Sequence, residues 1–197
     1  MQTTSHILLF FGSFNPIHKG HLFLAKTAIE QYHFDEVWFV LSPLNPFKQA
    51  THLLSEKDRM QMILLSIKNE ANFRFSSIEL DMPQPSYTIH TLQKLYTLHP
   101  NVQFDILMGQ DNLEHFYKWK EAEKILSLCT LYVYPRFEVS NRTNDTPVLP
   151  PHINLQAKLL PISSTQIREK WQKGETILPF MERNAAHYFM QLKASLL

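Results

Sequence analysis

The stretch Phe10-Phe11-Gly12-Ser13-Phe14-Asn15-Pro16-Ile17-His18-Lys19-Gly20-His21-Leu22 carries most of the structural information in this chain. The residues from Ile7 to Phe11 are all apolar, which predicts a buried parallel strand. A glycine-containing turn follows, and an amphipathic run over 21–33 predicts a helix. This order places two histidines and a row of backbone N–H groups at a helix N-terminus, where anions bind. The segment therefore predicts a phosphate-binding loop.

The same alternation of strand and helix continues along the chain. Further strands are predicted over 36–42, 73–80, 102–108 and 129–134, with a short one within 153–160. Further helices are predicted over 55–67, 88–98, 112–128 with a break near 116–118, 163–171, and most of 178–197. This pattern predicts an α/β fold: a Rossmann-like, doubly wound, mainly parallel sheet with helices on both faces and a helical C-terminal part.

Length and composition place the chain among compact proteins without extended charged tracts. With 197 residues, 44% of them hydrophobic, we expect a single domain over 1–197, of which 163–197 forms a helical C-terminal subregion. The net charge is +1 and no block of like charge occurs, so we expect no nucleic-acid or membrane partner. No signal peptide or membrane-length apolar run is recognisable, which favours a cytoplasmic location. The single cysteine, Cys129, is expected to be a small buried hydrophobe in a strand rather than a catalytic thiol.

Three unusual loops, at 12–20, 43–48 and 109–111, each follow a predicted strand. Ligands of parallel sheets bind beyond the carboxyl ends of the strands, so we expect these loops to form one shared site. Three of the four glycines, Gly12, Gly20 and Gly109, fall in them. Their backbone freedom is therefore expected to serve that site.

His18 and His21 are the first candidates for chemistry. They could simply cap a helix, or they could bind zinc. A zinc site would need further ligands, and the sequence contains no cysteine cluster and no His-Glu-x-x-His helix. Contact with phosphate is the simpler interpretation.

The segment 12–21 resembles the His-x-Gly-His motif of a nucleotidyltransferase superfamily. Residues 162–168, Ile-Ser-Ser-Thr-Gln-Ile-Arg, are similar to the superfamily's distal Ile-Ser-Ser-Thr-x-Ile-Arg motif. Residues 86–92, Ser-Tyr-Thr-Ile-His-Thr-Leu, the Gly109-Gln110-Asp111 turn and Trp119 resemble segments of the bacterial nicotinate-mononucleotide adenylyltransferases. The resemblance runs in order along nearly the whole chain.

The resemblance implies a role for each matching position. Those expected in catalysis are His18, His21, Lys48 and Arg168. Those expected to bind ATP and its phosphates are Gly12, Ser13, Phe14, Gly109, Asp111, Arg136, Ser164 and Thr165. Those expected to bind the mononucleotide are Tyr87 and Thr88 at its carboxylate and Trp119 stacked on its pyridine ring. Purely structural roles remain open: helix capping for Asp111, a helix start for Tyr87 and Thr88, packing for Trp119, and a solvated loop for Lys48.

The chain departs from the family pattern at three positions. Phe11 stands where the family has glycine, Asn15 where it has an acid, and Phe47 where it has histidine. Asn15 removes one negative charge near the expected phosphates.

The resemblance implies adenylyl transfer from ATP to nicotinate mononucleotide, giving deamido-NAD and pyrophosphate in NAD biosynthesis. The attacking 5′-phosphate is already ionised, so catalysis needs positioning and charge stabilisation, with Mg²⁺ carried by ATP. Alternatives are nicotinamide mononucleotide or phosphopantetheine as acceptor, or a non-catalytic nucleotide-binding module. N–H donors at Tyr87 and Thr88 with no carboxylate nearby would favour nicotinate. The chain could also form a homo-oligomer.

Overall fold

A computed structural model of the chain describes residues 4–43, 53–135, 148–158 and 160–192. The strands of this described part are β1 (Ser5–Gly12), β2 (Glu36–Leu41), β3 (Phe73–Ser76), β4 (Val102–Gly109), β5 (Leu131–Tyr134) and β6 (Ile153–Asn154). The helices are α1 (Lys19–Tyr32), α2 (Glu56–Ile67), α3 (Thr88–Leu98), α4 (Gln110–Leu113), the 3₁₀ turn η1 (Phe116–Lys118), α5 (Ala122–Leu128), α6 (Ser164–Gln172) and α7 (Arg183–Gln191).

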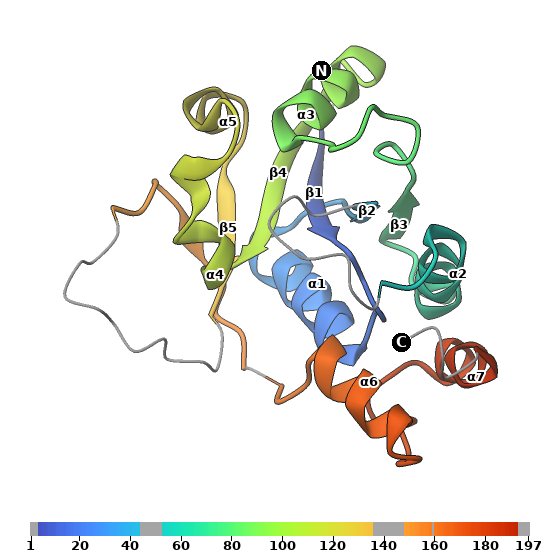
Figure 1. Ribbon diagram of the computed structural model, residues 1–197. Helices are drawn as coiled ribbons and strands as arrows, with labels where there is room; N and C mark the ends of the chain where they lie inside the picture. Colours follow the sequence, from blue (N-terminus) through green and yellow to red (C-terminus); the bar gives the residue numbers. More distant parts are fainter. Residues whose placement is uncertain (1–3, 44–52, 136–147, 159, 193–197) are drawn as a thin grey trace.

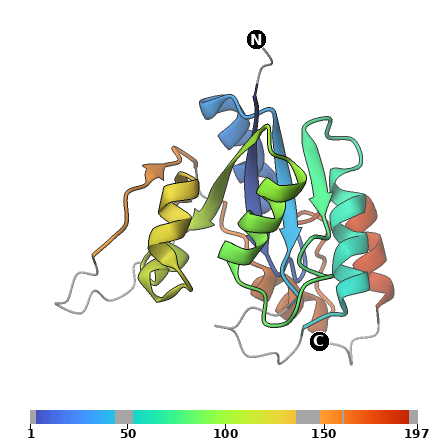
Figure 2. The same cartoon turned by 90° about the horizontal axis from the view of Figure 1, so that it is seen from above.

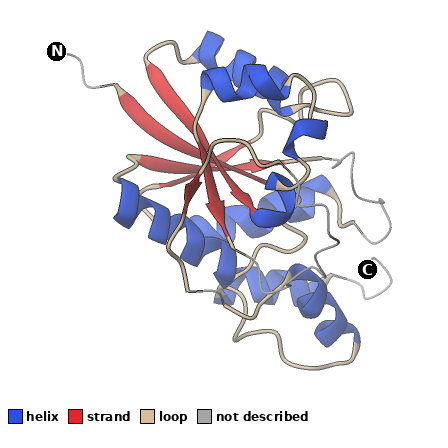
Figure 3. Cartoon of the chain, turned by 90° about the vertical axis from the view of Figure 1, so that its left-hand side faces the viewer, coloured by secondary structure: helices blue, strands red, loops and turns tan. Residues whose placement is uncertain are grey.

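The strands form one sheet in the order β3-β2-β1-β4-β5-β6, and every neighbouring pair is parallel (Figure 1). The chain moves outward from β1 to β3, then returns to place β4 on the other side of β1. The carboxyl ends of β1 and β4 therefore flank the switch point, where doubly wound sheets bind ligands. The predicted α/β fold with a parallel sheet is confirmed, and Figure 3 shows helices on both sides of the strands.

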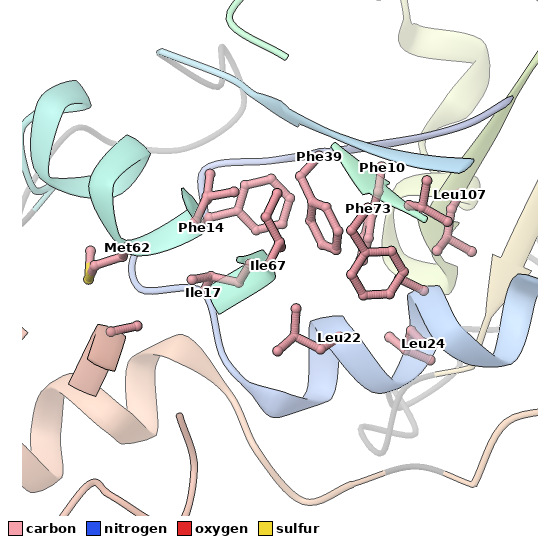
Figure 4. Close-up of a cluster of buried hydrophobic side chains, with 14 of the residues drawn as sticks. Phe10, Phe14, Ile17, Leu22, Leu24, Phe39, Met62, Ile67, Phe73 and Leu107 are labelled. Carbon is pink, nitrogen blue, oxygen red and sulfur yellow. The ribbon is translucent and has the colours of Figure 1, made fainter. Parts of the chain in front are cut away.

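Each face of the sheet has its own hydrophobic core, because successive strand residues point to opposite faces. Leu8 and Phe10 of β1 join the cluster that α1, α2, α6 and α7 cover (Figure 4). Ile7 and Leu9 join the cluster that α3 and α5 cover. The uninterrupted apolar run of β1 is thus explained by burial on both faces.

The C-terminal helices extend the first of these layers. Figures 1 and 2 both show α7 lying beside α2. The hydroxyl of Tyr188 on α7 donates to Asp58 Oδ1 on α2 at 2.8 Å. The preceding segment contacts α1, since Lys19 Nζ donates to the carbonyl of Pro179 at 3.0 Å. In the described part of the chain, no helix is long and apolar enough to cross a membrane.

Several element boundaries differ from the sequence predictions. The strand predicted to reach Leu80 ends at Ser76, because the chain turns there and Leu80 N–H donates to the Ser77 carbonyl at 2.8 Å. The helix predicted over 112–128 is divided into α4, η1 and α5, so the expected break near 116–118 is confirmed. The helix predicted from Leu178 begins only at Arg183. Pro179 lies in the intervening turn, where its missing N–H does no harm.

The prediction that Cys129 lies in a strand is wrong, since it follows α5 and β5 begins only at Leu131, and its side chain is half-buried. Its Sγ contacts the Ile125 carbonyl at 3.3 Å. Burial raises the pKa of this thiol to about 12. A thiol with a raised pKa is a poor nucleophile, which agrees with the expected packing role and not with a catalytic one.

Candidate active site

The two histidines lie together at the N-terminus of α1. His18 occupies the N-cap position, and its N–H donates to Nδ1 of His21 at 3.2 Å. The two rings stack with centroids 3.7 Å apart. A Cβ atom added at Gly20 would lie 2.9 Å from Nδ1 of His18, so glycine is needed for the His18 ring to take this position. The motif therefore holds both imidazoles at the positive end of a helix.

The loop before α1 is anchored by an inward-facing aromatic ring. The side chain of Phe14 is 2% exposed and packs against Phe10 and Phe39, with ring centroids 5.7 Å away in both cases (Figure 4). Its φ of 43° lies in the left-handed region, which strains a residue other than glycine. A Cβ atom at Gly12 would lie 2.9 Å from this ring. Phe14 can therefore face a ligand only through its backbone, while its side chain belongs to the core.

The distal motif contacts the first one directly. Ser163 is the N-cap of α6, and its hydroxyl accepts from Gln166 N–H at 3.2 Å. Ser164 Oγ donates to the carbonyl of Pro16 at 2.9 Å. Arg168 Nη1 donates to the carbonyl of Asn15 at 2.7 Å. The two motifs, far apart in sequence, are thus in direct contact.

Arg168 also reaches back to its own helix, where Nη2 donates to Thr165 Oγ1 at 3.3 Å. Burial lowers the pKa of this guanidinium. The group is half-buried beside the loop, so its positive charge is held at a defined place.

A cavity of about 290 Å³ lies at the carboxyl ends of β1 and β4. Its lining includes Gly12 at the end of β1 and Ser13 directly after it, together with Tyr87 and Thr88 at the start of α3. Trp119 also lines the cavity, and its ring packs on Phe116 with centroids 5.3 Å apart. The structure thus brings these five predicted residues around one cavity, whereas His18, His21 and Arg168 do not line it.

The turn after β4 differs in detail from the sequence prediction. Gly109, and not Asp111, is the N-cap of α4, so the suggested capping role of Asp111 is wrong. Asp111 lies in the first turn of this short helix, and the neighbouring Asn112 lines the cavity.

Sequence reasoning missed several residues of the cavity wall. They are Phe11, Ser42, Glu79, Ser86, Asn112, Lys118 and Lys120. Two lysines thus flank Trp119, and Lys120 Nζ lies 4.9 Å from the centroid of the Tyr87 ring. An acid between two apolar residues, as in Ile78-Glu79-Leu80, is the sequence feature that could have indicated a buried role for Glu79.

The sequence also gave no indication of Arg59, the largest fully buried side chain of the described residues. Its Nη1 donates to the carbonyls of Ser13 at 2.8 Å and Ser42 at 2.9 Å. Its Nε and Nη2 donate to the carbonyls of Leu54 and Pro43. Burial lowers its pKa to about 10, so it remains a cation at neutral pH. Arg59 therefore ties the loop after β1 to the loop after β2.

Two of the three departures from the family pattern have structural roles. Asn15 is buried, and its Oδ1 accepts from the N–H of Leu54 at 3.1 Å. Phe11 contributes to the cavity wall. Lys48, Phe47 and Arg136 lie outside the described residues. Among the residues that are described, no three His, Cys, Asp or Glu side chains are grouped so as to hold a metal ion.

Comparison with solved structures gives the same fold. Plasmodium falciparum nicotinic acid mononucleotide adenylyltransferase complexed with NaAD aligns with a TM-score of 0.76 at 22% identity, over 95% of each chain. The same protein complexed with APC aligns with a TM-score of 0.73 at 21% identity, again over 95% of each chain. At this level of identity the similarity establishes the fold.

Sequence comparison identifies the family. The cytidylyltransferase-like family model matches residues 9–170. A protein of Cytophaga hutchinsonii named "Probable nicotinate-nucleotide adenylyltransferase" is 42% identical over 188 residues, which cover 94% of this chain and 95% of that protein. A protein of the same name from Bacteroides fragilis is 42% identical over 88% of this chain and 85% of its own length. The chain belongs to the cytidylyltransferase-like family and, within it, to the nicotinate-nucleotide adenylyltransferases.

Proposed function

We propose that this protein transfers the adenylyl group of ATP to nicotinate mononucleotide, giving deamido-NAD and pyrophosphate. The observation that carries the proposal is the junction of the two motifs. Arg168 and Ser164 of α6 bind the backbone of the loop at Asn15 and Pro16, directly before the histidines of α1. These contacts support an anion site formed by the Arg168 guanidinium, the two imidazoles and the N-terminus of α1.

The proposed reaction is an in-line displacement at the α-phosphorus of ATP by the 5′-phosphate of the mononucleotide. A bond forms from a phosphate oxygen of the mononucleotide to the α-phosphorus, and the bond from that phosphorus to the bridging oxygen of pyrophosphate breaks. The nucleophile is ionised at neutral pH, so no general base is required. The site must orient two polyanions and stabilise charge on the departing pyrophosphate, which is the task of His18, His21 and Arg168. Mg²⁺ enters as part of the ATP complex, bound by phosphate oxygens and water.

The proposed binding mode places the mononucleotide in the cavity, with its pyridine ring on Trp119 and its carboxylate at the start of α3. The first N–H groups of a helix have no partner within the helix and favour an anion. From the sequence, we expect nicotinate to be favoured if no carboxylate lies near Tyr87 and Thr88. This condition is not met, because Glu79 lies in the cavity wall. Its oxygens, however, accept hydrogen bonds from Ser86 and Thr91 within the protein. Lys118 and Lys120 add two positive charges to the same wall, which favours the acid over the amide.

A pyrophosphate-release assay with purified protein and MgATP tests the proposal. Nicotinate mononucleotide, nicotinamide mononucleotide and phosphopantetheine are offered separately and then in competition. We expect turnover with nicotinate mononucleotide to exceed that with the other two. Absence of Mg²⁺-dependent pyrophosphate release with every acceptor would reject the enzyme and leave a nucleotide-binding module.

The role of His21 is tested in the same assay. A charge-stabilising donor contributes ~3 kcal/mol to a transition state, so His21→Ala should lower turnover by about 100-fold or more. His115→Ala, an exposed histidine outside the proposed site, is the matched control. Turnover of H21A near that of the control would refute the assigned role.

A further inference from the structure

Glu79 is a buried acid in the cavity wall that the proposed chemistry does not use. Its side chain accepts hydrogen bonds from Ser86 Oγ at 3.0 Å and Thr91 Oγ1 at 2.8 Å. The hydroxyl of Ser42 is a third partner. The residue is 3% exposed, and Thr91 is fully buried. The carboxylate is therefore held in place by three neutral hydroxyl groups.

These three partners come from the two sides of the cavity. Ser86 and Thr91 lie on either side of Tyr87 and Thr88, at the start of α3. Ser42 follows β2, and its N–H donates to the carbonyl of Gly12 at 2.9 Å. Glu79 thus joins the start of α3 to the strand ends that carry the phosphate loop.

This arrangement costs folding free energy. Burial raises the pKa of Glu79, because the three hydroxyls compensate only part of the lost hydration of a carboxylate. A buried carboxylate that is bonded only to neutral groups lowers the stability of the folded protein, and such groups are typical of functional sites. A role in holding the cavity wall accounts for this cost.

We propose that Glu79 is a positioning residue for the mononucleotide, fixing the Tyr87–Thr88 backbone against the end of β2. This inference rests on the proposed function, because it assigns the mononucleotide to this wall. Removing the charge loosens the start of α3 while the phosphate loop keeps its own anchors at Arg59 and Arg168. Loss of Glu79 therefore weakens mononucleotide binding and leaves ATP binding in place.

The test compares Glu79→Gln with Asp81→Asn, which removes the same charge from an exposed site two residues away. KM for nicotinate mononucleotide and for ATP is measured by pyrophosphate release, and the melting temperature of each variant by calorimetry. For E79Q we expect the mononucleotide KM to rise about tenfold, equivalent to ~1.4 kcal/mol, with the ATP KM within about twofold of wild type. D81N should match the wild type in both constants.

A second variant protects the test against a folding defect. Thr91→Val removes one donor to the carboxylate and keeps the shape of the side chain, so it should raise the mononucleotide KM in the same selective way by a smaller factor. Equal rises in both KM values, or no change in either, would overturn the positioning role. Wild-type protein inactive with every acceptor would instead reject the proposed function, so the two failures are distinguishable.

Discussion

Substitution of Arg59 tests whether one buried cation holds the two loops of the phosphate side together. Arg59→Met keeps most of the side-chain volume and removes four hydrogen bonds to carbonyl oxygens. A hydrogen bond to a charged group contributes ~1.5–3 kcal/mol after exchange with water, so four additive bonds would set an upper limit of roughly 6–12 kcal/mol. Removing one partner of a buried charged group typically costs ~3–5 kcal/mol, which is the loss expected for R59M.

Urea unfolding of R59M followed by circular dichroism measures this loss. A change of ~3–5 kcal/mol corresponds to a fall in melting temperature of roughly 10 °C for a chain of this size. Arg59→Lys retains the charge but cannot reach all four acceptors, so it should lose ~2 kcal/mol. The control is Arg74→Met, whose ion pair with Glu36 at 3.0 Å is largely exposed and should matter by less than ~1 kcal/mol. A loss below ~1 kcal/mol in R59M would refute the assignment of Arg59 as the anchor of these loops.

Three further substitutions test the two sides of the site. Gly20→Ala brings a methyl group to 2.9 Å from the His18 ring and displaces that ring. We expect kcat to fall by at least about tenfold at unchanged mononucleotide KM, and an unchanged kcat would show that the ring position is unimportant. Trp119→Ala should raise the mononucleotide KM by about tenfold and the ATP KM by less, because ring stacking contributes ~1 kcal/mol or more; equal effects on both constants would refute the stacking assignment. Lys120→Met should reduce the preference for nicotinate over nicotinamide mononucleotide by several-fold, because the interaction of one exposed lysine with a carboxylate contributes ~1 kcal/mol. The control is Lys124→Met, which removes a lysine paired with Glu121 and should leave the preference unchanged.

The parts of the site that follow one another closely in sequence were predictable. The glycine turn, the two histidines and the helix start of α1 are local features, and their spacing alone indicated an anion site. The helix predicted from residue 163 likewise corresponds to α6, of which Ser163 is the N-cap. That these two motifs meet was predictable from the family resemblance, and the Ser164 and Arg168 contacts to the first loop confirm it.

The parts that depend on distant backbone groups were not predictable. The four acceptors of Arg59 come from three separate segments, and no spacing in the sequence connects a helix arginine to those carbonyls. Phe14 was expected to cover phosphates, but its strained backbone turns the ring into the core. The predicted strand beyond Ser76 failed for a related reason, because the alternating pattern continues into a turn that carries Glu79.

The buried charges beneath the two sides of the site have opposite signs. Below the phosphate loop lies the Arg59 cation, and its field favours the ATP phosphates that the loop is proposed to meet. Below the mononucleotide wall lies the Glu79 carboxyl, which positions this wall through Ser86 and Thr91 although its field opposes a substrate carboxylate, so the exposed charges of Lys118 and Lys120 must offset that field. The charge at Arg59 therefore acts on ATP in the same sense as the Arg168 guanidinium, whereas the charge at Glu79 acts against the lysines. Substitutions on the two sides should consequently change different kinetic parameters. Changes at the loop anchors should alter the KM for ATP, whereas changes at Glu79, Lys118 or Lys120 should alter the preference for nicotinate over nicotinamide mononucleotide.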